Sequence, residues 1–224
     1  MAPLLKICGL RQAEQAEAVA ALGVDAIGVI AVASSPRWVC PEDRQQLFGR
    51  IAVVAPACRR VLVVADPGDD DLPLLAAAAG PTVVQLHGDE SPQRCAVLRD
   101  RLPGIGLWKA LRIRQPQDLE LADAYAPVVD ALLLDAWVPD QLGGTGHRIP
   151  LEWLTSFAPS RPWWLAGGIR ADRIGAVQQA FGCQALGPSG LDASSGVERA
   201  PADKDLAAVA ALVAAVRAWP KAPG

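Results

Sequence analysis

The sequence predicts an α/β fold, a single (β/α)8 TIM barrel that spans residues 1–224 as one domain. Short apolar stretches, typical of buried strands, alternate along the chain with stretches of helical periodicity. Such alternation indicates a parallel sheet, because parallel neighbours need a crossover between them. Eight units in 224 residues fit the compact end of the barrel range, roughly 200 to 250 residues.

Eight stretches follow this pattern as strands. The first ends at Cys8, where the period changes from that of a strand to that of a helix. The eighth is the least regular, because two glycines and Pro188 interrupt it. Lys6 and Lys109 lie in apolar strands and need carboxylate partners if they are buried. The predicted strands are residues 4–8, 26–30, 60–65, 82–86, 106–111, 128–134, 163–166 and 184–192.

A helical pattern follows each predicted strand. Gly23 is a stop signal for the first helix. Pro41 begins the second, with Glu42 and Asp43 in the first turn, where the helix dipole favours acids. Ser91 caps the fourth. The predicted helices are residues 11–22, a segment that begins at 41, and residues 72–79, 91–102, 115–125, 151–157, 171–181 and 203–219.

An open, doubly wound sheet is the structural alternative. Its dinucleotide-binding version places Gly-x-Gly-x-x-Gly after the first strand, and this chain has no such motif there. No low-complexity linker or clear internal repeat divides the chain. The barrel therefore remains the prediction, and in a barrel function sits on the loops that follow the strands.

The composition excludes several classes of protein. Hydrophobic residues make up 51%, more than a disordered chain carries. A net charge of −3 gives no sign of a nucleic-acid partner. No apolar run is long enough to cross a membrane, and no signal peptide is recognisable. We therefore expect a cytoplasmic protein with neither a nucleic-acid nor a membrane partner.

The five cysteines are scattered along the chain, and none forms Cys-x-x-Cys. Only two histidines accompany them, so we do not expect a metal site. An odd, dispersed set of cysteines is typical of free thiols in a reducing cytosol and not of a disulfide framework.

Polar residues and tight turns follow several predicted strands, and together they suit a small anionic substrate. Backbone amides at glycine turns can hold a phosphate, which in barrels often lies between the loops after strands seven and eight. Gly167-Gly168 and Ser194-Ser195-Gly196 fall in those two loops, although both could be ordinary tight turns. The strand-end residues are Cys8, Gly9, residues 34–37, Asp66, His87, Gly88, Arg112, Asp135 and the two turns.

Each of these side chains also has a plainer interpretation. A lone cysteine such as Cys8 is more often a buried small hydrophobe than a reactive thiol. Asp135 alone could cap a helix or form a turn. His87 could be a structural histidine, and Arg37 could be a solvated surface charge.

Eight stretches occur in a fixed order from the first strand to the last helix. They are Lys6-Ile7-Cys8-Gly9, Ser35-Pro36-Arg37, residues 84–90 (VQLHGDE), Lys109-Ala110, Leu133-Leu134-Asp135, residues 143–146 (GGTG), Ala166-Gly167-Gly168 and residues 191–198 (LDASSGVE). Together they resemble the motifs of the phosphoribosylanthranilate isomerase family of tryptophan biosynthesis. Any one of them is weak, but the combination of the first, the third and the last is specific.

The resemblance implies an Amadori rearrangement. N-(5'-phosphoribosyl)anthranilate becomes 1-(2-carboxyphenylamino)-1-deoxyribulose 5-phosphate, without a cofactor or a metal. The resemblance implies Cys8 as the general base, Asp135 as the general acid, and a monomer or homodimer that binds this small molecule. The substrate-binding residues it implies are Arg37 for the anthranilate carboxylate, Gln85, His87, Gly144 in a closing loop, Asp192, and for the phosphate Gly167, Gly168, Ser194, Ser195 and Gly196.

The chemistry fits these residue types. The acid must stay protonated near neutral pH to open the sugar ring, and a carboxyl group does so where its surroundings disfavour the charge. A free thiol is only a few per cent ionised at neutral pH, so Cys8 needs help to act as a base. The iminium cation formed on ring opening could supply part of that help.

Two functional alternatives stay open. Sugar-phosphate barrels of histidine biosynthesis perform a similar isomerisation, but with an aspartate where this chain has Cys8. An inactive barrel that only binds phosphosugars is the second alternative, and the intact Cys8 and Asp135 argue against it. Residues 31–33 stand where the family often has aromatic residues and a proline, in the stretch expected beside the anthranilate ring.

Overall fold

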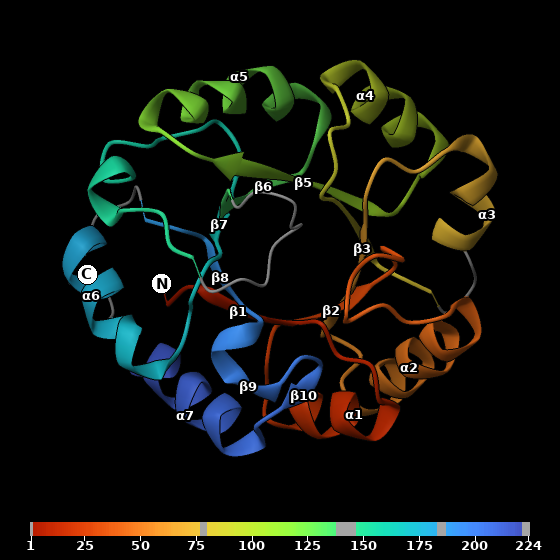
Figure 1. Cartoon of the computed structure of the whole chain (residues 1–224), viewed down its shortest axis with the longest axis horizontal. Helices are drawn as coiled ribbons and strands as arrows, with labels where there is room; N and C mark the ends of the chain where they lie inside the picture. The colour runs from red at the N-terminus through yellow and green to blue at the C-terminus, as the bar shows by residue number, and fades with distance from the viewer. Residues whose placement is uncertain (1, 77–79, 138–146, 183–186, 221–224) are drawn as a thin grey trace.

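The computed structural model of the protein describes residues 2–76, 80–137, 147–182 and 187–220. Eight parallel strands close into a barrel whose order follows the chain from β1 to β8 (Figure 1). Pairing of β1 with β8 closes the ring, so the predicted barrel is confirmed and the open sheet is excluded. The strands are β1 Leu4–Cys8, β2 Ala26–Ile30, β3 Arg59–Val64, β4 Val83–Leu86, β5 Gly106–Ile113, β6 Ala131–Ala136, β7 Trp163–Leu165 and β8 Gly190–Ala193.

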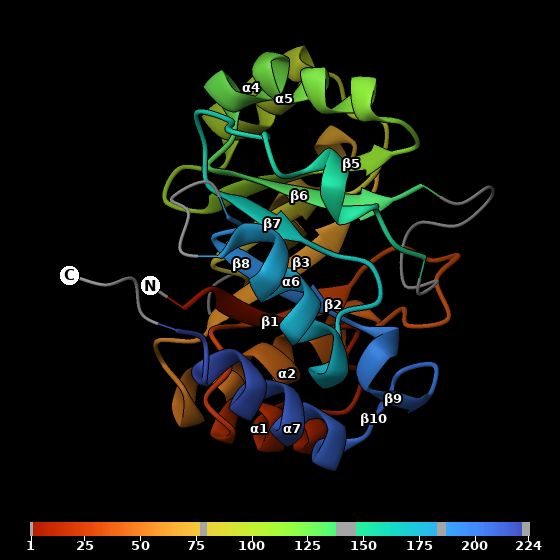
Figure 2. The same ribbon diagram turned by 90° about the vertical axis from the view of Figure 1, so that its left-hand side faces the viewer.

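Helices surround the ring of strands on its outside (Figure 1, Figure 2). The predicted helix signals are confirmed: Ser91 Oγ accepts a hydrogen bond from Arg94 N at 3.2 Å, and Pro41 is the first residue of α2. Gly23 follows α1 with a φ of 82°, a conformation that favours glycine. The helices are α1 Ala13–Ala21, α2 Pro41–Val54, α3 Leu72–Leu75, α4 Pro92–Arg101, α5 Leu121–Tyr125, α6 Ile174–Phe181 and α7 Leu206–Arg217.

The segment after β6 differs from its prediction. Residues 151–157 form only a 3-10 turn, Leu151–Trp153, in place of a helix. Thr155 Oγ donates to the Glu152 carbonyl oxygen at 3.1 Å, a local bond that competes with the helical hydrogen-bond ladder.

The last predicted helix begins at Leu206, three residues later than expected. Asp203–Lys204 (β10) instead pairs in antiparallel fashion with Glu198–Ala200 (β9). Asp205 then caps α7, because its side chain accepts hydrogen bonds from the first backbone amides of the helix. The resulting β9–β10 hairpin lies outside the barrel ring.

The eighth strand is confirmed at Gly190–Ala193, which is shorter than the predicted 184–192. Its pairing with β7 begins where Ser189 N donates to the Trp163 carbonyl oxygen at 2.8 Å. The preceding Pro188 has no N–H to extend that ladder. Residues 184–186 of the prediction lie outside the described residues.

The strands separate two hydrophobic cores. Outward-facing side chains pack under the helices, and inward-facing ones form a smaller core within the barrel. There Trp108 and Trp164 stack with ring centroids 4.7 Å apart. A Cβ at Gly190 would overlap the Trp164 ring, so glycine makes room for it. These rings fill part of the barrel interior, and the inward-facing residues at the carboxyl ends of the strands remain for the site.

None of the helices in the described part of the chain is long and apolar enough to span a membrane.

Candidate active site

Cys8 and Asp135 occupy the carboxyl ends of β1 and β6. The ring order places β7 and β8 between them on the short way round, so the two residues lie across the barrel mouth and not side by side. Both side chains are buried. The predicted placement of the two groups is therefore confirmed.

Lys6 lies two residues before Cys8, so both side chains point into the barrel. Its ammonium contacts both carboxylate oxygens of Asp192 at 3.1 Å across the β1–β8 pairing. Gly28 of β2 makes room for this arrangement, since a Cβ there would lie 2.6 Å from Cys8 Sγ and 3.0 Å from Lys6 Cε. Lys6 is fully buried, and its predicted need for a carboxylate partner is confirmed.

Opposing influences act on the Cys8 thiol. Burial is the largest and raises the pKa of Cys8, while the charge of Lys6 acts in the opposite direction. Asp192 adds to the rise, whereas Lys204 and a hydrogen bond from Lys6 lower it. Burial also disfavours the Lys6 ammonium, but Asp192 and then Cys8 outweigh it and raise the pKa of Lys6. A thiol, an ammonium and a carboxylate thus share the mouth end of β1 and β8.

Arg37 lies in the loop after β2 and is held by Glu198. Its Nε and Nη2 donate to the two carboxylate oxygens at 2.9 and 2.6 Å. Lys204 donates to the same carboxylate at 2.5 Å and to the Ser194 carbonyl oxygen at 3.3 Å. Burial alone would raise the pKa of Glu198, but Arg37 and Lys204 outweigh it and lower that pKa. Arg37 is therefore a buried, paired cation and not a solvated surface charge.

Gln85, His87 and Asp135 form the opposite side of the mouth. Gln85 Nε2 lies 3.1 Å from His87 Nδ1, which makes Nδ1 the acceptor and assigns the ring proton to Nε2. His87 Nε2 lies 3.7 Å from Asp135 Oδ2, too far for a hydrogen bond. Within the described ranges, Gln85 Oε1, His87 Nε2 and Ser194 Oγ are buried without a hydrogen-bond partner. These atoms can bind the polar groups of a ligand.

Burial keeps this side of the mouth largely uncharged. It raises the pKa of Asp135 to about 7, with a further contribution from Asp192. Burial, followed by the charge of Lys109, lowers the pKa of His87 to about 3. Near pH 7 His87 is therefore neutral, and a large fraction of Asp135 carries a proton.

The turns after β7 and β8 lie against each other at the same end of the barrel as the two titratable groups. A Cβ at Gly196 would overlap the carbonyl oxygen of Ile169. Gly167 and Gly168 have φ angles of 84° and 61°, in the left-handed region that favours glycine. Arg173 donates a hydrogen bond to the Gly167 carbonyl oxygen and so fixes that turn. The two turns are therefore close enough to bind one phosphate between them.

Sequence reasoning missed Glu198 and Lys204 as parts of this site. Glu198 closes the last of the matching motifs, which is a signal that could have found it. Lys204 gave no signal, because its place beside Glu198 depends on a hairpin that the sequence did not predict. Asp192, expected to bind substrate, is held by Lys6. The predicted Gly144 lies outside the described residues.

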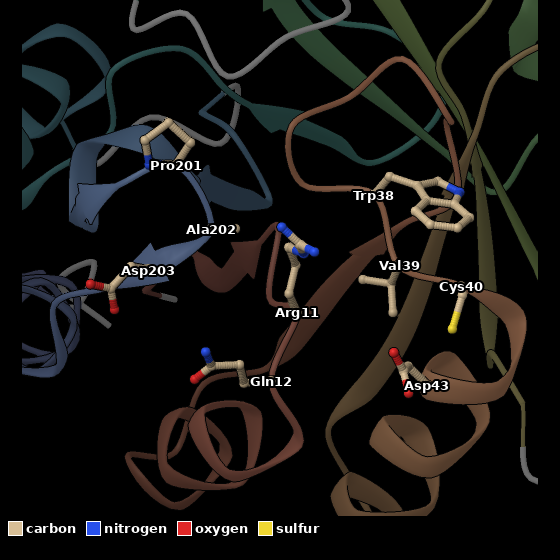
Figure 3. Close-up of a pocket in the computed structure, with 9 residues that line it drawn as sticks. All are labelled: Arg11, Gln12, Trp38, Val39, Cys40, Asp43, Pro201, Ala202 and Asp203. Carbon is tan, nitrogen blue, oxygen red and sulfur yellow. The ribbon is translucent and has the colours of Figure 1, made fainter.

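A pocket of about 450 Å³ lies beside the mouth, between the loops after β1 and β2 and the β9–β10 hairpin. Figure 3 shows Arg11 between Trp38 on one side and Pro201 and Ala202 on the other. None of the predicted site residues is among the described residues that line it. Over the same described ranges, His, Cys, Asp and Glu form no cluster of three or more suited to a metal ion.

A closed parallel barrel with buried titratable groups and paired glycine turns at the carboxyl ends of its strands is an enzyme of the (β/α)8 class. This chain belongs to the N-(5'phosphoribosyl)anthranilate (PRA) isomerase family, which it matches over residues 5–215. The N-(5'-phosphoribosyl)anthranilate isomerase of Synechococcus elongatus is 48% identical over 209 residues, covering 93% of each chain. The enzyme of the same name from Synechocystis sp. is 44% identical over 215 residues, covering 95% of this chain and 94% of that one.

Solved structures of the same enzyme from other organisms share the fold. Phosphoribosyl anthranilate isomerase from Thermus thermophilus has a TM-score of 0.80 and 30% identity, covering 97% of this chain and 100% of that one. The enzyme from Thermotoga maritima has a TM-score of 0.82 and 25% identity, covering 96% and 98%.

Proposed function

We propose that this chain is a phosphoribosylanthranilate isomerase of tryptophan biosynthesis, which converts N-(5'-phosphoribosyl)anthranilate to 1-(2-carboxyphenylamino)-1-deoxyribulose 5-phosphate by an Amadori rearrangement. Family membership supports this reaction. A related structure of phosphoribosyl anthranilate isomerase, 25% identical, was solved with the reduced form of that product. The observation that carries the proposal is the pair of buried groups, the Cys8 thiol and the Asp135 carboxyl group, on opposite sides of one barrel mouth.

In the proposed mechanism Asp135 is the general acid. Its carboxyl group gives a proton to the ring oxygen of the sugar, the bond from carbon 1 to that oxygen breaks, and an iminium forms at carbon 1. A pKa of about 7 keeps enough of the acid protonated for this step near neutral pH. His87 stays neutral beside it, so it does not compete as a charged partner.

Cys8 is the proposed general base. As a thiolate it takes the proton from carbon 2, and the released electron pair forms the enolamine and neutralises the iminium. The enolamine then becomes the ketone. Because the thiol and the carboxyl group lie across the mouth from each other, they act on opposite sides of the substrate.

The substrate has two anionic ends, a carboxylate and a phosphate. Arg37 is the proposed ligand of the first, and the turns after β7 and β8 are the proposed ligands of the second. Arg37 uses Nε and Nη2 on Glu198, so its contact with the anthranilate carboxylate would be made through Nη1. The turns at Gly167-Gly168 and Ser194-Ser195-Gly196 would hold the phosphate through backbone amides. Gln85, His87 and Asp192 stay proposed substrate ligands, and so does Gly144 in the loop that would close over the site.

The expectations on domain organisation, cofactors, location and partners are also part of this proposal. The chain works as one domain over residues 1–224, needs no cofactor or metal, and acts in the cytoplasm. A monomer or a homodimer is consistent with the Thermotoga maritima enzyme, whose structure is described as mutually generated monomers of a dimeric enzyme. Neither nucleic acid nor a membrane is a proposed partner.

The direct test is turnover of N-(5'-phosphoribosyl)anthranilate by the purified full chain, followed by chromatography of the ketose product. We expect multiple turnovers without added cofactor and after treatment with a chelator. Binding of the substrate without product would favour an inactive phosphosugar-binding barrel. Turnover of only the related aminoaldose of histidine biosynthesis would contradict the proposed substrate.

A further inference from the structure

Lys6 is a buried cation that the proposed mechanism leaves without a role. Its side chain is fully buried inside the barrel, and it lies on the same face of β1 as Cys8. Lys6 Cε and Cys8 Sγ would both lie within 3.0 Å of one point, the place where Gly28 lacks a Cβ. The missing side chain on β2 therefore opens a single space that the lysine stem and the sulfur share.

Asp192 fixes the ammonium at the end of that stem. The two carboxylate oxygens each accept a bond from Lys6 Nζ at 3.1 Å, and the backbones of the two residues are directly paired in the β1–β8 ladder. Because its aliphatic chain packs against Gly28 and its ammonium is held by Asp192, Lys6 has little freedom to move away from the sulfur. The ammonium carries three N–H groups, and its bonds to the two oxygens of Asp192 leave an N–H for a neighbour such as Cys8.

The charged groups around Cys8 come from four elements: Lys6 on β1, Arg37 after β2, Asp192 on β8 and Lys204 on β10. Arg37 and Lys204 both donate to Glu198, so that acid takes up much of their charge. Among these cations Lys6 has the strongest influence on Cys8.

We propose that Lys6 is a positioning residue for the reaction: held by Asp192, it sets its ammonium beside the Cys8 sulfur and stabilises the thiolate that takes the substrate proton. This inference rests on the proposed role of Cys8 as the base. The thiol proton leaves to solvent before the substrate reacts. The thiolate then takes the carbon 2 proton and becomes a neutral thiol, while Lys6 keeps its own proton throughout.

The competing explanation is that Lys6 and Asp192 form a merely structural ion pair. The chain supplies a matched example of such a pair, Lys109 and Glu90, which are also buried and lie 2.9 Å apart. Lys109 points away from the barrel interior, since its neighbours Trp108 and Ala110 face inward. If Lys6 were only structural, replacing either ion pair by neutral residues would have the same effect on the titration midpoint of the Cys8 thiol.

The test is the titration of Cys8 in the full-length chain, followed by the ultraviolet absorbance of the thiolate. Each protein is compared with the same protein carrying Cys8→Ala, so that the other cysteines cancel. Lys6→Met should move the midpoint of Cys8 upward by about one pH unit or more, a roughly tenfold lower thiolate fraction at fixed pH. The double variant Lys6→Met, Asp192→Asn leaves no unpaired charge in the barrel and should move it in the same direction, because Lys6 acts on Cys8 more strongly than Asp192 does.

Asp192→Asn alone should move the midpoint downward, because it removes the negative neighbour and leaves the ammonium to the sulfur. The control variant Lys109→Met, Glu90→Gln should leave it unchanged. An unmoved midpoint in the Lys6 variants, or an equal shift in the control, would overturn the role of Lys6 and leave the proposed function standing. Near-normal turnover by Cys8→Ala would contradict the role of Cys8 as the base and with it the role of Lys6, whereas absence of turnover by the wild-type chain would contradict the proposed function.

Discussion

On the β1–β8 side of the mouth, three buried or nearly buried cations each meet a carboxylate at hydrogen-bond distance. They are Lys6, Arg37 and Lys204, and their partners are Asp192 and Glu198. On the β4–β6 side, Gln85 Oε1 and His87 Nε2 are buried without a hydrogen-bond partner among the described residues, and none of those residues places a cation at bonding distance from Asp135.

The difference follows from what each side has to do in the proposed reaction. A base must carry negative charge when the substrate arrives, and nearby cations favour that form. An acid must still hold its proton, and burial without a counter-charge favours the neutral form, as the pKa of about 7 for Asp135 indicates. One barrel mouth thus provides two electrostatic environments, with β7 between the β4–β6 side and the β1–β8 side.

The largest effect is expected from removing either proton-transfer group. Cys8→Ala and Asp135→Asn should each lower kcat by at least ~10²-fold, with KM changed much less, because general acid or base catalysis contributes ~10²–10⁴-fold. Steady-state kinetics on the folded variants measures this. Cys95→Ala, at another buried thiol under the helices, is the control and should keep near-normal kcat. Near-normal kcat in folded Cys8→Ala would restore the interpretation of a buried structural thiol.

A second prediction concerns the two turns after β7 and β8. Gly196→Ala would push a methyl group into the Ile169 carbonyl oxygen and part the two turns. We expect KM to rise on the order of tenfold, which corresponds to about 1.4 kcal/mol of binding. Gly175→Ala in α6 is the control, since nothing lies within 4 Å of a Cβ there. Equal KM values for the two variants would argue against phosphate binding at the turns.

The substitution Arg37→Ala tests whether the β1–β8 side of the mouth binds the substrate carboxylate. If the guanidinium holds the carboxylate equally in the ground and transition states, the loss should appear as a several-fold higher KM with kcat nearly unchanged. Arg50, a half-exposed arginine paired with Glu14 on the helical surface, provides the control Arg50→Ala. A selective fall in kcat for Arg37→Ala would place Arg37 in the chemical step instead.

The smallest effect, on stability, should have opposite signs on the two sides. Asp135 has a folded pKa above its unfolded value of 3.8, so its contribution to stability is full below that value and is lost as pH rises through about 7. Asp135→Asn removes this loss and should stabilise the protein at pH 8 by roughly 1 kcal/mol or more, below an upper limit of about 4 kcal/mol for a shift of this size.

Glu198 has a lowered folded pKa, so its contribution is present above the unfolded pKa and is lost as pH falls through the folded one. Glu198→Gln should therefore destabilise the protein at pH 8, and the difference from the wild type should shrink in acid. Urea denaturation of both variants and the wild type at pH 8 and pH 5 gives the change in the free energy of unfolding caused by each substitution at the two pH values. If that change had the same sign at pH 8 for both variants, the contrast between the two sides would be contradicted.

The sequence by itself determined the barrel, because alternation of strand and helix periods is a local property of the chain. It also placed Cys8 and Asp135, since a residue at the end of a parallel strand must lie at the mouth. It required carboxylate partners for Lys6 and Lys109, because a buried ammonium needs one. The glycines of the two turns were found in the same way, from local backbone requirements.

Only the tertiary structure decided which charges meet. Lys6 finds Asp192 because β8 closes the ring onto β1, a pairing of residues 186 positions apart. Lys204 reaches Glu198 through a hairpin that replaced the first turn of a predicted helix. The pKa of Asp135 depends on its burial and on Asp192 of β8. Coulomb forces and desolvation depend on distance in space, which the order of residues fixes only after the barrel has closed.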